Sequence, residues 1–350
     1  MLRLAPVSSQ ELWQLPLDIV ALGLSLPTHS VAVDAILKRE STRVSDQLGA
    51  LSDEFRARLT SNLGIESVLC EKNGSSRDRG REAAAQALGA AGIAGKDIGL
   101  ILDFSTFADD APGIWSLAHD IQHHISASDA LALGTRGSGC CGLHMALRTA
   151  QAYFSADSNL RFALLVATDR APDNGRACLP VSIMSDAASA VVIARAGLAP
   201  RRIGLVRAVI TQSSGRFSDV ISADSATAGI SIDAGVFEQQ ILPLHFVVLS
   251  RVFSRALAAA QLNRSDIQAV IYPNTTKLDR RSVARALDFD PRCLLGPGPQ
   301  HRGHAFANDL LINAQSLFDS VTEAPVHSAW LATGSGFTWG AAIVDATNRC

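Results

Sequence analysis

The chain has 350 residues, of which 47% are hydrophobic and 18% are charged. This length can bury a large core and suggests two domains or one large domain. The formal net charge of -2 at pH 7 does not favour binding to nucleic acid or to an anionic membrane surface.

The sequence also argues against a membrane span, a secretory signal and a disulfide framework. It contains no uninterrupted apolar run of about 18 residues, and its first residues lack the continuous apolar region of a secretory signal. The six cysteines are scattered, with no CxxC pair and no Cys/His spacing typical of a zinc site. We therefore expect a cytoplasmic α/β protein with reduced thiols and no bound metal.

Apolar runs rich in Val, Ile and Leu alternate with helical patterns along the chain. Strands are predicted near 18–25, 98–106, 161–168, 187–195, 203–212, 268–273, 328–333 and 338–346. Helices are predicted near 80–92, 141–156, 246–261, 277–287 and 305–320. This alternation predicts a largely parallel sheet system with helices covering its faces.

The sequence resembles itself at a long offset. At a shift of 169, residues 84–106 lie without gaps on 253–275, and both segments read as an Ala-rich helix, an Asp-Ile turn and a buried strand. At a shift near 165, Ala167-Thr168 meets Ala332-Thr333. Two such internal similarities at nearly the same offset predict a duplicated α/β half, with domains at 18–198 and 202–350.

Cys140 is the first candidate for chemistry. It lies in a Gly/Ser-rich turn directly before the helical pattern of 141–156. The free N–H groups and the positive dipole end of a helix stabilise a thiolate, which is the reactive form of a nucleophilic cysteine. The alternative is that Cys140 and Cys141 are two small buried residues under a tight turn, and the composition alone favours it.

The segment around Cys140 resembles the nucleophile motif of ketosynthase III enzymes, with CCGL at 140–143 followed by Ala-Leu at 146–147. Residues 18–27 are similar to the first strand and turn of that family, 182–195 to its Gly-Asp-Gly segment, and 334–344 to its glycine-rich end. The resemblance covers nearly the whole chain. It implies the thiolase fold, in which two duplicated βαβ-rich halves stack as five α-β-α-β-α layers, and it favours Cys140 as the nucleophile.

Two positions depart from the family pattern. Ketosynthase III enzymes have Pro-His where this chain has Pro273-Asn274, and Gly-Asn where it has Gly303-His304. The order Cys–Asn–His instead resembles thiolases, although their second catalytic cysteine has no counterpart here. This resemblance implies that His304 activates Cys140 and that Asn274 donates a hydrogen bond to a thioester or enolate oxygen. The exchange puts decarboxylation of malonyl-type extenders in doubt.

The resemblance also places an oxyanion hole at the backbone N–H groups of Cys140 and Ser335. A purely structural role is the alternative for each of the two exchanged residues. His304 could be a locally hydrogen-bonded histidine at a helix start, and Asn274 could be a residue that ends a strand. His144 is a further histidine near the nucleophile, and a structural role is the simpler interpretation.

Sites for a nucleotide have weaker support. Arg201-Arg202 and Arg280-Arg281 are candidates for the phosphates of coenzyme A or a carrier protein, but solvated surface is the simpler interpretation. The coenzyme-A-stacking tryptophan of the family is missing from 52–65, and no GxGxxG precedes a helix.

We therefore expect an acyltransferase or condensing enzyme without a permanently bound cofactor. It would load an acyl group from acyl-CoA or acyl-carrier protein on Cys140 and pass it to a carbon nucleophile, a hydroxyl or an amine, in specialised metabolite biosynthesis. The alternative is a non-catalytic partner subunit of a ketosynthase-like heterodimer. From the resemblance we also expect a dimer, either of identical or of related subunits.

Overall fold

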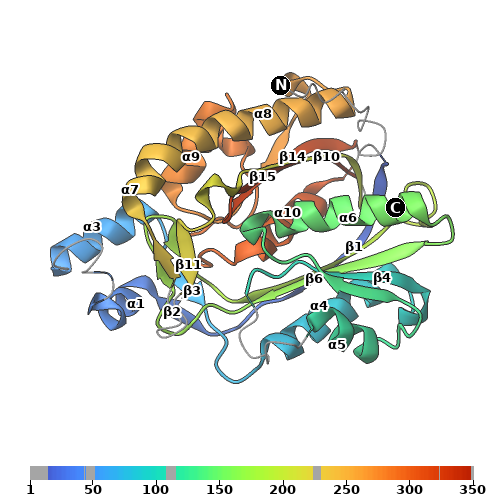
Figure 1. Ribbon diagram of the computed structural model, residues 1–350, viewed down its shortest axis with the longest axis horizontal. Coiled ribbons are helices and arrows are strands. Elements are labelled where there is room, and N and C mark those ends of the chain that lie inside the picture. The colour runs from blue at the N-terminus through green and yellow to red at the C-terminus, as the bar shows by residue number, and fades with distance from the viewer. Residues whose placement is uncertain are drawn as a thin grey trace.

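The computed structural model describes residues 15–42, 44, 52–107, 116–223, 230–322 and 324–347, and these residues form five layers (Figure 1). Helices α8 (Leu242–Ala260) and α9 (Lys277–Ala286) cover one sheet layer, and helices α4 (Ser76–Ala91) and α5 (Leu117–His124) cover the other. Helices α6 (Gly142–Ala156) and α10 (Asp309–Ser320) lie between the two. The predicted five-layer α/β fold is confirmed.

All main strands belong to one hydrogen-bonded sheet that contributes both strand layers. Its order is β13 (Ala269–Ile271), β14 (Val326–Gly334), β15 (Thr338–Ala346), β10 (Gly204–Ser213), β1 (Leu17–Ser25), β9 (Ala187–Arg195), β6 (Phe162–Asp169), β4 (Ile98–Asp103) and β5 (Leu131–Gly134). From the β10–β1 junction outward, each half begins with its first strand (β1 or β10), which is followed by its last strand (β9 or β15). Two parallel strands come next, β6 and β4 in one half and β14 and β13 in the other. A duplicated half predicts this arrangement; the domain boundaries at 18–198 and 202–350 stay a prediction.

The expectation of a largely parallel sheet was wrong. Only β13–β14, β4–β5 and β4–β6 pair in parallel, while β1–β10, β1–β9, β10–β15, β14–β15 and β6–β9 are antiparallel. The reason is that strands such as β14 and β15 follow each other through a short turn, which brings the chain back in the opposite direction. Alternation of strands and helices detects the crossovers but not these returns.

The predicted internal repeat corresponds to matching local structure. Helices α4 and α8 both end on a left-handed residue, Gly92 in one and Gln261 in the other. A short 3-10 turn follows each helix at the predicted shift of 169, η2 (Gly95–Asp97) and η6 (Arg264–Asp266), and each turn leads into a buried strand.

Strand β5 was not predicted from the sequence, and neither were the shorter elements. They are α1 (Val33–Arg39), α3 (Asp53–Leu63), α7 (Ala234–Val236), the π-helical turn η5 (Phe237–Ile241), β2 (Ser30–Ala32), β3 (Ser67–Leu69), β7 (Ala177–Cys178), β8 (Ser182–Ile183), β11 (Ile221–Ala223) and β12 (Ile230–Ile232), with 3-10 turns η3 (Gly139–Cys141), η4 (Gly215–Phe217), η7 (Pro291–Cys293) and η8 (Phe306–Asn308). Several of them gather at one end of the layers, at the left of Figure 1.

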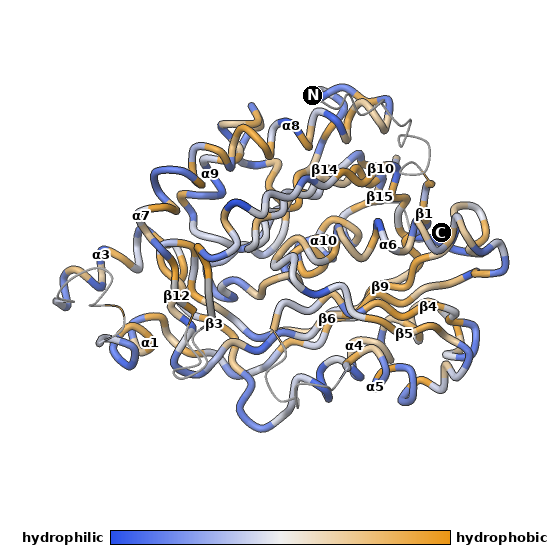
Figure 2. Tube along the Cα trace, viewed as in Figure 1, coloured by the Kyte–Doolittle hydropathy of each residue, from blue (hydrophilic) through white to orange (hydrophobic). Residues whose placement is uncertain are grey.

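The apolar strands form the core between the helix layers. Figure 2 shows β4, β6 and β9 mostly in the hydrophobic colours, with hydrophilic turns at their ends. Every residue of β6 is buried, so both faces of this strand are covered by helices.

Helix α8 belongs to the segment Ala234–Ala260, which is long and apolar enough to cross a membrane by length and composition alone. Its buried residues, including Val248, Leu249, Val252 and Phe253, belong to the same core cluster as strands β14 and β15. In this structure α8 is therefore a core helix of the upper layers.

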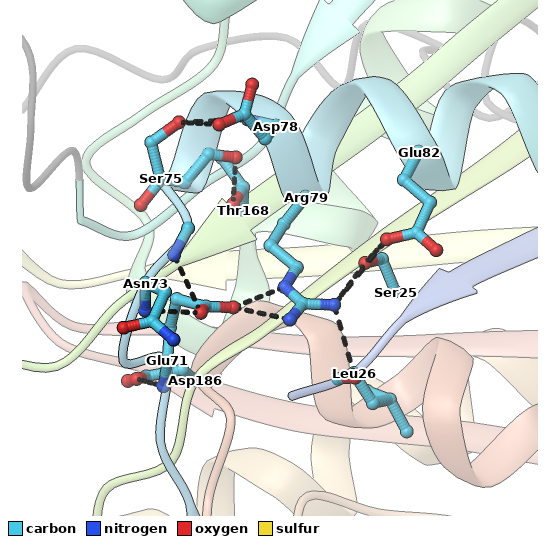
Figure 3. Close-up of polar contacts among 12 residues, drawn as sticks. Ser25, Leu26, Glu71, Asn73, Ser75, Asp78, Arg79, Glu82, Thr168 and Asp186 are labelled. Carbon is cyan, nitrogen blue, oxygen red and sulfur yellow. Dashed lines mark hydrogen bonds and ion pairs between the residues drawn. The ribbon is translucent and has the colours of Figure 1, made fainter. Parts of the chain in front are cut away.

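A network of charged residues fixes the loop between β3 and α4 (Figure 3). The guanidinium of Arg79 pairs with Glu71 at 2.5 Å and also contacts Glu82 and the Leu26 carbonyl. Burial opposes ionisation of Glu71, but hydrogen bonds from Gly74 and Asn73 and the pairing with Arg79 outweigh it and lower the pKa of Glu71 to about 2.

Asp186 connects this loop to the rest of the N-terminal half. One of its carboxylate oxygens accepts the Glu71 N–H at 2.7 Å, and the carboxylate pairs with the buried guanidinium of Arg176 at 2.7 and 2.9 Å. Asp186 belongs to the segment that resembles the Gly-Asp-Gly segment of ketosynthase III enzymes. In this structure its carboxylate pairs with a buried arginine.

Removing this carboxylate should destabilise the fold. In Asp186→Ala the Arg176 charge is left buried without its main partner, and we expect a loss of about 3–5 kcal/mol in the free energy of unfolding. Urea denaturation measures it. Asp173→Ala is the matched control, because Asp173 contacts the same guanidinium from an exposed position at 3.9 Å and should matter little. Equal effects of the two substitutions would contradict this assignment.

Candidate active site

Cys140 lies in the 3-10 turn η3, which runs directly into helix α6. Its side chain is partly accessible, whereas the neighbouring Cys141 is fully buried and donates its S–H to the Ala332 carbonyl at 3.3 Å. Cys140 is therefore the thiol of this pair that a substrate can reach.

His304 lies directly opposite Cys140, with its Nε2 atom 3.1 Å from the Cys140 Sγ atom. Its backbone is pinned by the N-terminal half, because the His304 N–H donates to the Ile183 carbonyl and the Ser185 N–H donates to the His304 carbonyl. The structure thus brings together the two residues that the sequence predicted as nucleophile and base, from helix starts 164 residues apart in the chain.

Asp309 completes the arrangement, and the sequence analysis missed it. It is the first residue of α10 and is fully buried, and its Oδ2 atom lies 2.5 Å from the His304 Nδ1 atom. This contact places the Nδ1 proton toward Asp309 and leaves Nε2 facing the thiol. An acidic residue five positions after His304, at the start of an apolar helix, was the signal that could have found it.

Asn274 belongs to the same network but is not among the residues that line the cavity at Cys140. Its backbone N–H donates to Asp309 Oδ2 at 2.6 Å and its side-chain amide donates to Asp309 Oδ1 at 3.3 Å. Its Oδ1 atom accepts a hydrogen bond from Asn313 at 3.0 Å. In this structure Asn274 holds Asp309, and the substrate-facing role expected from the sequence finds no support in this geometry.

Ser335 lies in the turn between β14 and β15, which packs against the Cys140 turn. A Cβ atom on Gly139 would lie 2.6 Å from the Ser335 nitrogen, and one on Gly334 would lie 1.7 Å from the Ser138 carbonyl oxygen. Only glycine allows the two backbones to approach so closely. The left-handed position of the turn is taken by Gly336 (φ 117°), so Ser335 itself is under no such constraint.

A cavity of about 670 Å³ opens at these residues. One part of its wall is apolar and includes Phe107, Cys178, Pro180, Val181, Met184, Ile230 and Phe306. Another part comes from η5, α8, α9 and the strand ends of the C-terminal half. It carries polar groups, including Glu238, His245, Tyr272, Thr275, Asp279, Ser282 and Thr333. No lysine or arginine is among the described residues that line it.

The electrostatic surroundings of His304 favour the imidazolium. Burial alone would lower its pKa, but the Cys140 thiolate and the Asp309 carboxylate, each also bonded to a ring nitrogen, outweigh burial and raise the pKa of His304 well above its ordinary value of 6.5. The imidazolium thus lies beside the Cys140 sulfur, an arrangement that suits a cysteine nucleophile.

Three other residues that the sequence analysis considered, His144, Arg202 and Arg280, do not line the cavity. His144 is buried and donates from Nε2 to the Trp330 carbonyl, and burial lowers the pKa of His144 to about 4. Arg280 is buried and donates to the carbonyls of Tyr272 and Pro273, while Arg202 pairs with Asp18. Within the described part of the chain, no group of three His, Cys, Asp or Glu side chains could hold a metal ion.

The layers and strand order describe a thiolase fold in which Cys140, His304 and Asp309 lie in contact with one another. No protein-family model matches the chain. It is 24% identical over 314 residues to beta-ketoacyl-[acyl-carrier-protein] synthase III of Escherichia coli (strain HS), a match that covers 87% of this chain and 95% of that protein.

Solved structures agree with this resemblance. ChlB3, described as an acyltransferase, superposes with a TM-score of 0.78 at 23% identity, covering 95% of this chain and 98% of its own. OleA of Xanthomonas campestris superposes with a TM-score of 0.80 at 18% identity, covering 98% and 100%. The chain has the thiolase fold and is similar to ketosynthase III enzymes over most of its length, as the sequence motifs predicted.

The charges around His304 can be tested by titration. Cys140→Ala and Asp309→Asn each remove a negative group that raises the pKa of His304, while burial continues to lower it, so both variants should lose the proton at a lower pH than wild type. NMR titration of the imidazole Hε1 signal measures this. Asp319→Asn, on the exposed side of the same helix, is the control and should leave the titration unchanged. An unshifted His304 in both active-site variants would contradict the arrangement.

Proposed function

We propose that this ketosynthase III-like enzyme is an acyltransferase that takes an acyl group from a thioester and passes it to a hydroxyl or amine acceptor. The observation that carries this proposal is the Cys140–His304–Asp309 arrangement, in which one imidazole bonded at both nitrogens faces the reactive sulfur. The same geometry argues against a non-catalytic partner subunit, because such a subunit has no need of a complete nucleophile and base.

The first half of the reaction forms a thioester on the enzyme. The Cys140 thiolate attacks the carbonyl carbon of the donor thioester, and the Cys140 and Ser335 backbone N–H groups stabilise the oxyanion of the tetrahedral intermediate. The C–S bond of the donor breaks, and His304 gives its proton to the departing thiolate. Asp309 keeps the ring in the tautomer and orientation that this transfer needs.

The second half uses the neutral His304 as a base. It takes the proton from the acceptor hydroxyl or amine as oxygen or nitrogen attacks the acyl carbon, and the Cys140 thiolate leaves. A Claisen condensation with a malonyl-type extender would need donors that stabilise the enolate formed on decarboxylation. Asn274, the residue at the place of the family histidine, is instead bonded to Asp309 and Asn313, which supports the heteroatom acceptor.

The donor, the pathway and the assembly belong to the same proposal. Acyl-CoA and acyl-carrier protein remain the two candidate donors, and the exchanged Asn274 and His304 support a role in specialised metabolite biosynthesis. A dimer of identical or related subunits and a cytoplasmic location are part of the proposal and rest on the family resemblance.

The nucleophile can be identified by intact-protein mass. Wild type mixed with acyl-CoAs of several chain lengths, or with acylated carrier protein, should gain the mass of one acyl group, and Cys140→Ala should gain none. Cys178→Ala is the matched control, since Cys178 lines the same cavity and should leave the adduct intact.

The base can be assigned in the same assay. His304→Ala should slow acyl loading by about a hundredfold or more, since general acid–base catalysis typically contributes 10²–10⁴-fold. Asn274→Ala should slow loading less, because it removes one of several donors to Asp309. No adduct on wild type from any donor, or equal loading rates in wild type and His304→Ala, would overturn the mechanism.

The acceptor class has a separate test. Acylated enzyme should lose its acyl group faster when a primary amine or alcohol is added, with formation of the amide or ester. Addition of malonyl-CoA should cause neither release of carbon dioxide nor a β-ketoacyl product. Carbon dioxide release that depends on the acylated enzyme would instead assign Claisen chemistry to this site.

A further inference from the structure

His245 on α8 is a buried cavity residue that the mechanism above does not use. It is 7% exposed and forms part of the cavity wall. Its Nδ1 atom lies 3.4 Å from the Trp339 Nε1 atom and 3.1 Å from the Thr333 Oγ1 atom. Because an indole N–H can only donate, Nδ1 must be the acceptor in this contact.

This contact fixes the chemistry of the other ring nitrogen. Burial lowers the pKa of His245, against a smaller opposing effect of Asp279, so the ring is neutral and its proton is on Nε2. The Nε2 atom is buried and has no hydrogen-bond partner among the described residues. A buried donor without an acceptor costs about 1–3 kcal/mol, so such groups usually mark a place that a ligand fills.

The position of His245 indicates which substrate would accept a hydrogen bond from its Nε2–H. Leu278 and Leu242 line the cavity and are 70% and 38% exposed, so the cavity opens to solvent on the α8–α9 side. His245 follows Leu242 by three residues on the same face of α8 and contacts Thr333, two residues before Ser335. The imidazole therefore lies between the mouth and the reacting centre.

A carboxylate acts on His245, and the described residues of the cavity wall include no lysine or arginine. Asp279 accepts hydrogen bonds from Tyr272 and Thr275 on one carboxylate oxygen, and its side chain also lines the cavity. A donor at His245 and an acceptor at Asp279 match a hydroxyl-bearing molecule, while the carboxylates disfavour an anion. The apolar part of the wall, with Phe107 and Phe306, suits the acyl chain.

We infer that His245 is a specificity-determining residue whose Nε2–H binds an oxygen of the acceptor other than the one that is acylated. The acceptor is then an uncharged molecule with at least two hydroxyl groups. This inference rests on the proposed acyl transfer. The Nε2 atom is covered in this structure, so the acceptor reaches it once a neighbouring wall side chain turns aside.

The test compares two acceptors that differ by one hydroxyl. Enzyme is acylated with the butanoyl thioester of N-acetylcysteamine, and the loss of the acyl group is followed by mass with cyclohexanol or with cis-cyclohexane-1,2-diol. Wild type should react faster with the diol. In His245→Leu the ratio of the diol rate to the cyclohexanol rate should fall by about tenfold, as expected for one lost hydrogen bond.

His245→Gln is the conservative control. Its amide oxygen can accept from Trp339 while its N–H groups donate into the cavity, so this variant should keep most of the preference for the diol. An equal preference in wild type and His245→Leu, or no preference in wild type, would overturn the inference. A loss confined to acyl loading would also overturn it, since His245 would then bind the arm of the donor.

A measurement on unmodified wild type separates this inference from the proposed function. With ¹⁵N-labelled histidine, the His245 signals should show protonation at Nε2, and the Nε2–H signal should move downfield on addition of the diol but not of cyclohexanol. If no acyl-enzyme forms, the proposed function fails while this result still decides the role of His245. A ring protonated at Nδ1, or an Nε2–H signal unmoved by the diol, would overturn the inference.

Discussion

The carboxylate of Asp309 is the group on which the reactive centre depends. It is buried at the start of α10 and accepts hydrogen bonds from the His304 ring, the Ala305 N–H and both the backbone and side chain of Asn274. Together these four donors hold the carboxylate in one position. The orientation of His304, and with it the direction in which Nε2 faces the Cys140 sulfur, follows from this one carboxylate.

The sequence predicted much of this molecule because its signals are local. The strand at 187–195 and the helix at 277–287 agree with β9 and α9 almost residue for residue, since long apolar runs and amphipathic patterns need no knowledge of the tertiary contacts. Strand direction was not predicted correctly, because whether a chain turns back or crosses over depends on a few turn residues. The short hairpins were missed for the same reason.

In the candidate active site, too, the residues found from the sequence are those with local signals. Cys140 and His304 were found because their residue types and flanking motifs carry chemistry in themselves. Asp309 was missed, and Asn274 was given a different task, because their roles depend on which atoms meet across 35 residues of chain. His245 and Thr333 show the limit most clearly, since only the buried, unpaired nitrogen distinguishes this histidine from a structural one.

The junction of the two halves has a consequence for how the site forms during folding. Strands β1 and β10 pair directly only from Leu17 to Ile19, yet the thiol, the imidazole and the glycine turn at Ser335 come from both sides of this seam. A chain in which only one side of the seam has folded lacks the Cys140–His304 contact and the close packing of the Gly139 and Ser335 turns. The contact between Cys140 and His304 therefore forms only when residues from both sides of the seam have packed together.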